Sequence, residues 1–313
     1  MNIMYYILYS ILWLLSRIPL RVLFLFSDLL YPFIYYVARY RRGVVRTNLI
    51  NSFPDKDLIE IIAIEKRFYR HFVDMVFETV KFIGIRKKDI PKHFKYKNPE
   101  IIDSLRAKNL SAVVGMGHYG NWEWLAFMPY YAPDYHSLSL YKTLHNKAID
   151  RLMIKIRSRF DVDMIPMQNA LRQILKLKSQ NIPMLCCFIA DQAPMGHTVE
   201  YCTMFLNQPS AIFSGLEKIA KHTKQPVLFL TINKVKRGQY EMEFFEIAID
   251  PSEYKEYEIT EKYTVLLEKH IQKTPEYWLW THKRWKRSHI ILENRERYIL
   301  SPSLKEFLDK NNL

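Results

Sequence analysis

His118 and Glu123 are the two residues of this chain whose types and spacing could do chemistry. Four residues separate them, and a strand-like segment, 112–114, leads into the glycines that come just before the histidine. Apolar residues at helical spacing follow the glutamate, so we expect a strand-to-helix turn that brings the two side chains together. A carboxylate beside an imidazole fixes the tautomer of the ring and raises its basicity. Because no Ser or Cys stands between them, the pattern favours a base that deprotonates a substrate hydroxyl directly.

A purely structural role for the same two residues stays open. A histidine in a turn and a glutamate at the start of a helix also occur where they only satisfy the backbone and complement the helix dipole. The strand, the glycines and the helix start favour chemistry, whereas the spacing alone does not decide between the two roles.

Length and composition bound the class of protein. The 313 residues are 49% hydrophobic and include eight glycines, which suits one large or two modest globular domains and excludes a fibrous or disordered chain. The net charge of +14 predicts an acidic partner, such as nucleic acid, anionic lipid or a phosphorylated carrier. The sequence has no metal-ligand spacing, P-loop or dinucleotide-binding fingerprint, so we expect neither a metal nor a cofactor.

The N-terminal segment favours a membrane among these partners. Residues 3–15 carry no charge, and residues 22–37 are apolar apart from two polar positions. Pro19 separates the stretches, and each is shorter than the roughly 20 residues of a spanning helix. Four arginines between residues 38 and 46 predict, by the positive-inside pattern, that the following chain is cytoplasmic. We therefore expect residues 1–45 to span a membrane or lie in its interface, with a buried core hairpin or a signal peptide as alternatives.

The rest of the chain alternates between strand-like and helical segments. We expect strands at 111–116, 136–141, 162–165, 183–190, 226–233 and 240–249. We expect helices at 57–82, 99–107, 146–159, 169–179, 209–223 and 258–273, and one from Glu123 that ends before Pro129. Such alternation predicts an α/β fold with a mostly parallel sheet flanked by helices. We place this domain at 46–295, between the N-terminal membrane anchor and a C-terminal tail at 296–313.

Functional groups in such sheets collect at the carboxyl ends of the strands. Asp191 and Gln192 directly follow the apolar strand 183–190 and form one such group, although they could equally cap a turn. A second group follows the strand that ends at Tyr141 and comprises Asn146, Asp150 and Arg157. Arginine is suited to holding phosphates, with a solvated basic helix face as the structural alternative.

The segment 278–287 interleaves aromatic and basic residues. This composition suits a surface that contacts lipid headgroups, and nucleic-acid binding is the alternative.

Several blocks of the sequence, taken together, resemble the lipid A biosynthesis acyltransferase family, the Kdo-dependent lauroyl/myristoyl transferases related to lysophospholipid acyltransferases. The blocks occur in order from the anchor to about Arg287, at 42–54, 117–123, 141–157, 190–192 and 275–286. One departure is that Phe205-Leu206-Asn207 stands where many members have Phe-Phe-Gly. Because of this difference, the acceptor lipid stays open.

The resemblance implies a membrane-bound enzyme with a glycerophosphate-acyltransferase-like fold. Its donor would be an acyl carrier protein thioester, and its acceptor a hydroxyl of a lipid A precursor. The family's base and supporting acid correspond to His118 and Glu123, and its arginine and Asp-Gln pair to Arg157 and Asp191-Gln192. The enzyme would lie at the inner membrane with its catalytic domain on the cytoplasmic side, and would bind no nucleic acid.

The transition state of such a transfer carries an oxyanion, which needs preorganised donors. We expect the backbone amides around Gly120 and Asn121, at the start of a helix, to supply them.

Two alternatives to this function remain. The acceptor could be a lysophospholipid or an amino-acid lipid. The chain could also be a basic, membrane-tethered binding protein without catalysis, which would have no use for His118 beside Glu123.

Overall fold

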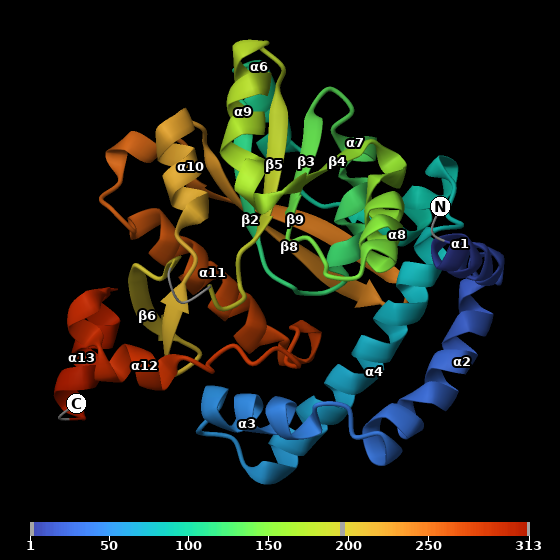
Figure 1. The fold of residues 1–313 in the computed structure, drawn as a ribbon, viewed down its shortest axis with the longest axis horizontal. Coiled ribbons are helices and arrows are strands. Elements are labelled where there is room, and N and C mark those ends of the chain that lie inside the picture. The colour runs from blue at the N-terminus through green and yellow to red at the C-terminus, as the bar shows by residue number, and fades with distance from the viewer. Residues whose placement is uncertain (1–2, 195–197, 312–313) are drawn as a thin grey trace.

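A seven-stranded sheet forms the centre of the computed structural model, which describes residues 3–194 and 198–311 (Figure 1). The strand order is β1-β9-β8-β2-β5-β3-β4. The strands are β1 (Phe94–Tyr96), β2 (Ala112–Met116), β3 (His136–Tyr141), β4 (Val162–Pro166), β5 (Met184–Ile189), β8 (Val227–Lys236) and β9 (Gln239–Ala248). From β8 to β4 all neighbours are parallel, and β9 turns back antiparallel to β8. The predicted α/β fold with a mostly parallel sheet is therefore confirmed.

Helices cover both faces of this sheet (Figure 1). Val113 of β2 belongs to the core that also contains side chains of α9 (Ala170–Ser179), α10 (Gly215–Thr223) and α11 (Glu258–Lys273). Its neighbours Ala112 and Val114 belong to a second core, with α6 (Glu100–Ala107), α7 (Met128–Tyr131) and α8 (Lys147–Arg157). Successive strand residues point to opposite faces, so a strand buried on both sides reads as a continuous apolar run.

The N-terminal helices pack along the outside of this body (Figure 1). They are α1 (Ile3–Ser16), α2 (Leu20–Pro32), a π-helical turn at Phe33–Val37, α3 (Arg42–Ser52) and α4 (Leu58–Phe82). The side chains of Asp57 and Glu60 form the predicted capping box at the start of α4. The stretch Leu20–Val37 is long and apolar enough to cross a membrane, judged by length and composition only, and 28% of it is buried against the protein.

Polar contacts join α2 to the rest of the protein. Ser27 donates a hydrogen bond to the carboxylate of Asp74 on α4 at 2.7 Å. Arg237, in the turn between β8 and β9, donates to both Asp28 and Asp74. The opposite faces of α1 and α2 expose large apolar side chains, among them Ile7, Ile11, Leu14, Leu25, Phe26 and Leu29. The N-terminal segment therefore packs on the rest of the protein on one side and presents an apolar surface on the other.

A small second sheet follows the main one, with the order β10-β6-β7. Its elements are β6 (Tyr201–Phe205), β7 (Gln208–Ile212) and β10 (Ile299–Leu300), with α12 (Ser288–Glu293) and α13 (Pro302–Lys310) nearby. The predicted helix at 209–223 is wrong in its first part, because these residues form β7. A turn with Leu206 and Asn207 in the left-handed region lets the chain fold back on β6 as a hairpin.

The helix predicted after Glu123 also differs. A 3₁₀ turn, η3 (Trp122–Phe127), comes first, and α7 then begins at Met128 with Pro129 in its first turn. Proline is tolerated there because its missing N–H would have no partner within the helix. The remaining short helical segments are Lys87–Asp89, α5 (Ile90–His93), Ser158–Phe160, Met167–Asn169, Pro251–Glu253, Pro275–Tyr277 and Arg295–Arg297.

Candidate active site

His118 and Asp191 meet at the carboxyl edge of the sheet. Each residue lies two positions beyond the end of its strand, and the strands β2 and β5 are parallel neighbours that pair Met116 with Ile189. Nδ1 of His118 donates to Asp191 Oδ1 at 2.6 Å, and the backbone N–H of His118 donates to Oδ2 at 2.8 Å. Equal offsets on paired strands therefore place the imidazole and the carboxylate in contact.

Asp191 is held as an ionised acceptor. Its side chain is only 2% exposed, and the indole N–H of Trp278 donates to Oδ2 at 2.7 Å. Burial alone would raise the pKa of Asp191, but the charge of His118 and the hydrogen bonds from His118 and Trp278 together lower it. With Nδ1–H donated to this carboxylate, Nε2 of His118 carries the lone pair. The side-chain nitrogen of Gln192 lies 3.4 Å from that Nε2 atom.

Glu123 lies beside this pair but bonds elsewhere. Arg157 donates Nε–H to Oε2 at 2.7 Å and an Nη2 hydrogen to Oε1 at 2.6 Å, and the indole N–H of Trp122 donates to Oε1 at 3.2 Å. The structure therefore corrects the prediction that Glu123 contacts the imidazole, because Nδ1 of His118 is hydrogen-bonded to Asp191 instead. The bidentate arrangement explains the difference, because a guanidinium fork matches a carboxylate closely.

The Glu123–Arg157 ion pair is largely shielded from solvent. The two side chains are 11% and 30% exposed. Burial alone would lower the pKa of Arg157, but the adjacent carboxylate of Glu123 raises it. The ring of Trp122 links the two halves of the site, with its centroid 5.1 Å from that of His118.

The other residues predicted on the basic helix have structural contacts. The side chain of Asn146 caps the start of α8 by accepting from the N–H groups of Ala148 and Ile149. Asp150 accepts from the backbone N–H of Leu144 at 2.8 Å. Tyr141 ends β3, and burial raises the pKa of its hydroxyl. Asn146 and Asp150 thus fix the start of the helix that carries Arg157, without a contact to His118 among the described residues.

The turn between His118 and Glu123 is fixed by its backbone. Gly120 has φ +63°, and a Cβ atom there would lie 1.8 Å from the carbonyl oxygen of Ile232, so only glycine fits. The N–H of Gly120 donates to the carbonyl of Tyr277 at 2.9 Å. This corrects the expectation that the Gly120 amide is available as an oxyanion donor.

Buried polar residues support the same turn from α4. The side-chain amide of Asn121 donates a hydrogen bond to Glu78 Oε2 at 2.7 Å, and the hydroxyl of Tyr240 donates to the same oxygen. Burial raises the pKa of Glu78 to about 7, an effect that the charge of Lys234 partly opposes. A ring nitrogen of His71 lies 3.1 Å from the carbonyl oxygen of Gly120, and burial lowers the pKa of His71 to about 3.

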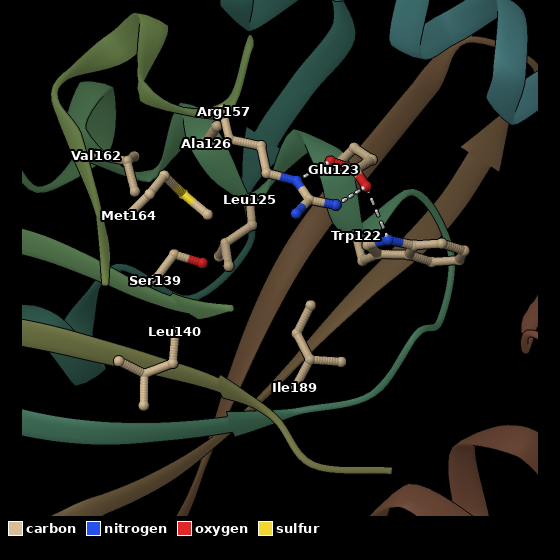
Figure 2. A pocket seen from close by; sticks show the side chains of 10 residues that line it. All are labelled: Trp122, Glu123, Leu125, Ala126, Ser139, Leu140, Arg157, Val162, Met164 and Ile189. Atoms are coloured by element: carbon tan, nitrogen blue, oxygen red, sulfur yellow. Dashed lines mark hydrogen bonds and ion pairs between the residues drawn. The ribbon is translucent and has the colours of Figure 1, made fainter. Parts of the chain in front are cut away.

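A narrow apolar pocket lies against the Glu123–Arg157 pair. Figure 2 shows the ion pair at one side, with apolar side chains around the space below it. The pocket encloses 40 Å³, and its apolar walls are Leu125, Ala126, Leu140, Val162, Met164 and Ile189. In this arrangement it is too small for a long hydrocarbon chain.

A model of the family described as bacterial lipid A biosynthesis acyltransferase matches residues 1–287 of this chain. The chain belongs to this family. No curated protein matches it. Family membership confirms the resemblance drawn from the sequence blocks and makes the protein an acyltransferase for a lipid A-type substrate. Together with the apolar helix at Leu20–Val37, it also suggests association with a membrane.

Sequence reasoning missed several residues that shape the site of this acyltransferase. Trp278 binds Asp191, although only a general surface role was predicted for its segment. Glu78 and His71 lie on the buried face of α4. A polar or charged residue at an apolar position of a helical pattern is rare, so it could have marked them as functional in the sequence. The sequence places Asp191 with Gln192 in a group of its own at a strand end, and its contact with the imidazole required knowledge of the strand order.

Proposed function

We propose that the protein transfers a fatty acyl group from an acyl carrier protein thioester to a hydroxyl of a lipid A precursor at the inner membrane, on its cytoplasmic side. Membership of the lipid A acyltransferase family supports the reaction class. The observation that carries the mechanism is the hydrogen bond from His118 Nδ1 to the buried carboxylate of Asp191. A net charge of +14 favours an acidic carrier protein as donor.

His118 acts as the general base in this proposal. Asp191 holds the ring in the tautomer whose Nε2 accepts a proton, as the acid of a hydrolase triad does. Nε2 removes the proton from the acceptor hydroxyl, and the oxygen attacks the thioester carbonyl. The tetrahedral intermediate then expels the thiolate, which takes the proton back from the imidazolium. An ester bond forms, a thioester bond breaks, and the thioester is already activated for the transfer.

Gln192 and the Glu123–Arg157 pair position the reactants. The side-chain amide of Gln192 lies next to Nε2 and so beside the reacting carbonyl, where an N–H donor stabilises an oxyanion. Arg157 holds Glu123 in two parallel hydrogen bonds and is 30% exposed, so an incoming phosphate can compete for its fork. Glu123 thereby acts through Arg157 and Trp122 rather than through the imidazole nitrogen.

Purified full-length protein tests this function with a lipid A precursor and two donors of equal chain length, one on acyl carrier protein and one on coenzyme A. Mass spectrometry should show one added acyl chain on an ester-linked hydroxyl. We expect the carrier protein donor to be preferred and its advantage to fall with salt, because exposed charges are screened. If the protein acylates only lysophospholipids or amino-acid lipids, one of these is the acceptor instead of a lipid A precursor. Absence of any transfer would overturn the proposal.

A further inference from the structure

A second apolar hollow lies on the side of the site that faces the N-terminal helices. It encloses 280 Å³ between α1, α4 and α8. Leu12 of α1, Met75, Val76 and Val80 of α4, and Met153 of α8 line its sides. We call it the α1–α4 groove. Its volume is seven times the 40 Å³ of the pocket behind the ion pair, and nearly all of its lining is apolar.

We propose that the α1–α4 groove holds a hydrocarbon chain of the acceptor lipid and guides its hydroxyl to His118. This proposal rests on the function proposed above, and it adds the place where the acceptor chain binds. Flexible methionine side chains suit such an occupant, because Met adapts its shape to irregular apolar ligands.

The inner end of the groove lies one aromatic ring away from His118. Trp122 and Glu123 close this end, and both also line the narrow pocket against the ion pair. The ring of Trp122 lies edge to face with the imidazole of His118, at a centroid distance of 5.1 Å. A chain in the groove therefore ends one aromatic ring away from the base, so the head of the same lipid lies at the reacting atoms.

The outer end of the groove adjoins the apolar outer surface of α1. Val76 on its rim is 46% exposed, and Ile11 and Leu15 of α1 expose 49% and 40% of their surfaces. Contacts hold α1 in this position. Lys81 of α4 donates to the carbonyl of Ser16, the last residue of α1, and to that of Ile18 just beyond it, and the guanidinium of Arg151 of α8 stacks on Tyr5. A bilayer that covers the apolar face of α1 would therefore lie against the mouth of the groove.

The acceptor rather than the donor fits this route. The acceptor is a membrane lipid whose chains stay among hydrocarbon, and a path from bilayer to groove keeps their methylenes out of water. The donor chain arrives on a water-soluble carrier protein, which approaches the exposed basic surface rather than the bilayer. The narrow pocket at Glu123 is lined from β3, β4, β5 and α8 rather than from α1 and α4.

Filling the groove tests the proposal. In Val76→Trp, the bulky side chain should raise KM for the fully acylated acceptor by about tenfold or more. The KM for an acceptor with shortened chains should change little, and so should the preference among donors of graded chain length. Val265→Trp on α11 replaces a similarly exposed valine, at 40%, outside the groove and should leave all three quantities unchanged. Melting curves of both variants check that they fold.

Two results would overturn the proposal. A shift of donor chain-length preference in Val76→Trp would assign the groove to the donor, and an unchanged KM for the full-length acceptor would leave the groove without a role in binding.

A photoreactive acceptor separates this proposal from the proposed function. The probe is a lipid A precursor with a diazirine in one acyl chain, incubated with the full-length wild-type protein in vesicles. Crosslinks should map to peptides of α4 and α8 that contain Met75 or Met153, and Val76→Trp should lose them. Crosslinks without acyl transfer would leave the groove standing and reject the proposed reaction, whereas transfer with crosslinks elsewhere would reject the groove.

Discussion

Two ion pairs flank one short turn, and they differ in what they leave available to a substrate. At one end Asp191 takes hydrogen bonds from the ring and the backbone of His118 and leaves Nε2 with its lone pair. At the other end both carboxylate oxygens of Glu123 accept hydrogen bonds from Arg157, so the two opposite charges neutralise each other. In the proposed mechanism the first pair transfers a proton and the second holds the shape of the site. Strand register, rather than distance along the chain, decides which acid contacts the base.

The largest effect is expected from breaking the first pair. His118→Ala should lower kcat by about 10³- to 10⁴-fold, and Asp191→Asn by about 10²- to 10⁴-fold, because an amide cannot hold the productive tautomer. Single-turnover rates with a saturating donor measure the loss, and circular dichroism checks the fold. Near-normal turnover by folded His118→Ala would contradict the assignment of the base.

Changes to the second pair should have a smaller effect. Glu123→Gln and Arg157→Lys should each lower kcat/KM by about 10- to 100-fold, since they disturb positioning and keep the base. Arg172→Lys is the matched control, because Arg172 is an exposed arginine on α9. The opposite result would be a loss with Glu123→Gln as large as that with His118→Ala, together with a small loss with Asp191→Asn. Glu123, and not Asp191, would then be the partner of the imidazole during the reaction.

Much of this arrangement was readable from the sequence, and the rest required the strand order. The periodicity at 57–82 and the apolar run at 183–190 predicted α4 and β5 nearly to the residue. The same patterns placed His118 and Asp191 at strand ends. Their contact was not predictable, because β3 and β4 come between β2 and β5 in the chain but not in the sheet.

Glu123 was misjudged for a related reason. The position of Glu123 five residues after His118 suggested a contact with the imidazole. The chain instead continues as a 3₁₀ turn, and the carboxylate of Glu123 pairs with Arg157, 34 residues further along the chain. Local spacing cannot reveal a competing cation on another helix. Likewise, the hairpin β6–β7 depends on a left-handed turn at Leu206 and Asn207, and of these two only Asn207 is a common turn residue.

The smallest expected effect concerns the buried acid that supports the turn shared by both pairs. In the folded protein the pKa of Glu78 is about 7, against an ordinary value of 4.5, so the folded state binds this proton more tightly than the unfolded chain. The free energy of unfolding should therefore fall as pH rises from about 4.5 to 7 because of this group. Glu78→Gln lacks that titration.

Chemical denaturation of wild type and Glu78→Gln across this pH range measures the difference. The advantage of the wild type over the variant should be greatest near pH 4.5 and should shrink towards pH 7. A difference that stays constant with pH would show that folding does not raise the pKa of Glu78. Glu65→Gln is the control, because Glu65 is also buried but is paired with Arg42 and Arg46.

The ion pair between Arg237 and Asp28 has a consequence for the order in which the chain is synthesised and folds. The two residues are 209 positions apart, and at the usual ~5–20 residues per second a ribosome needs roughly 10 to 40 s between them. During that interval α2 has left the ribosome without its cationic partner, and Asp74 on α4 likewise lacks the guanidinium that later joins it to α2. The N-terminal helices are therefore synthesised well before the turn between β8 and β9 whose arginine joins α2 to α4.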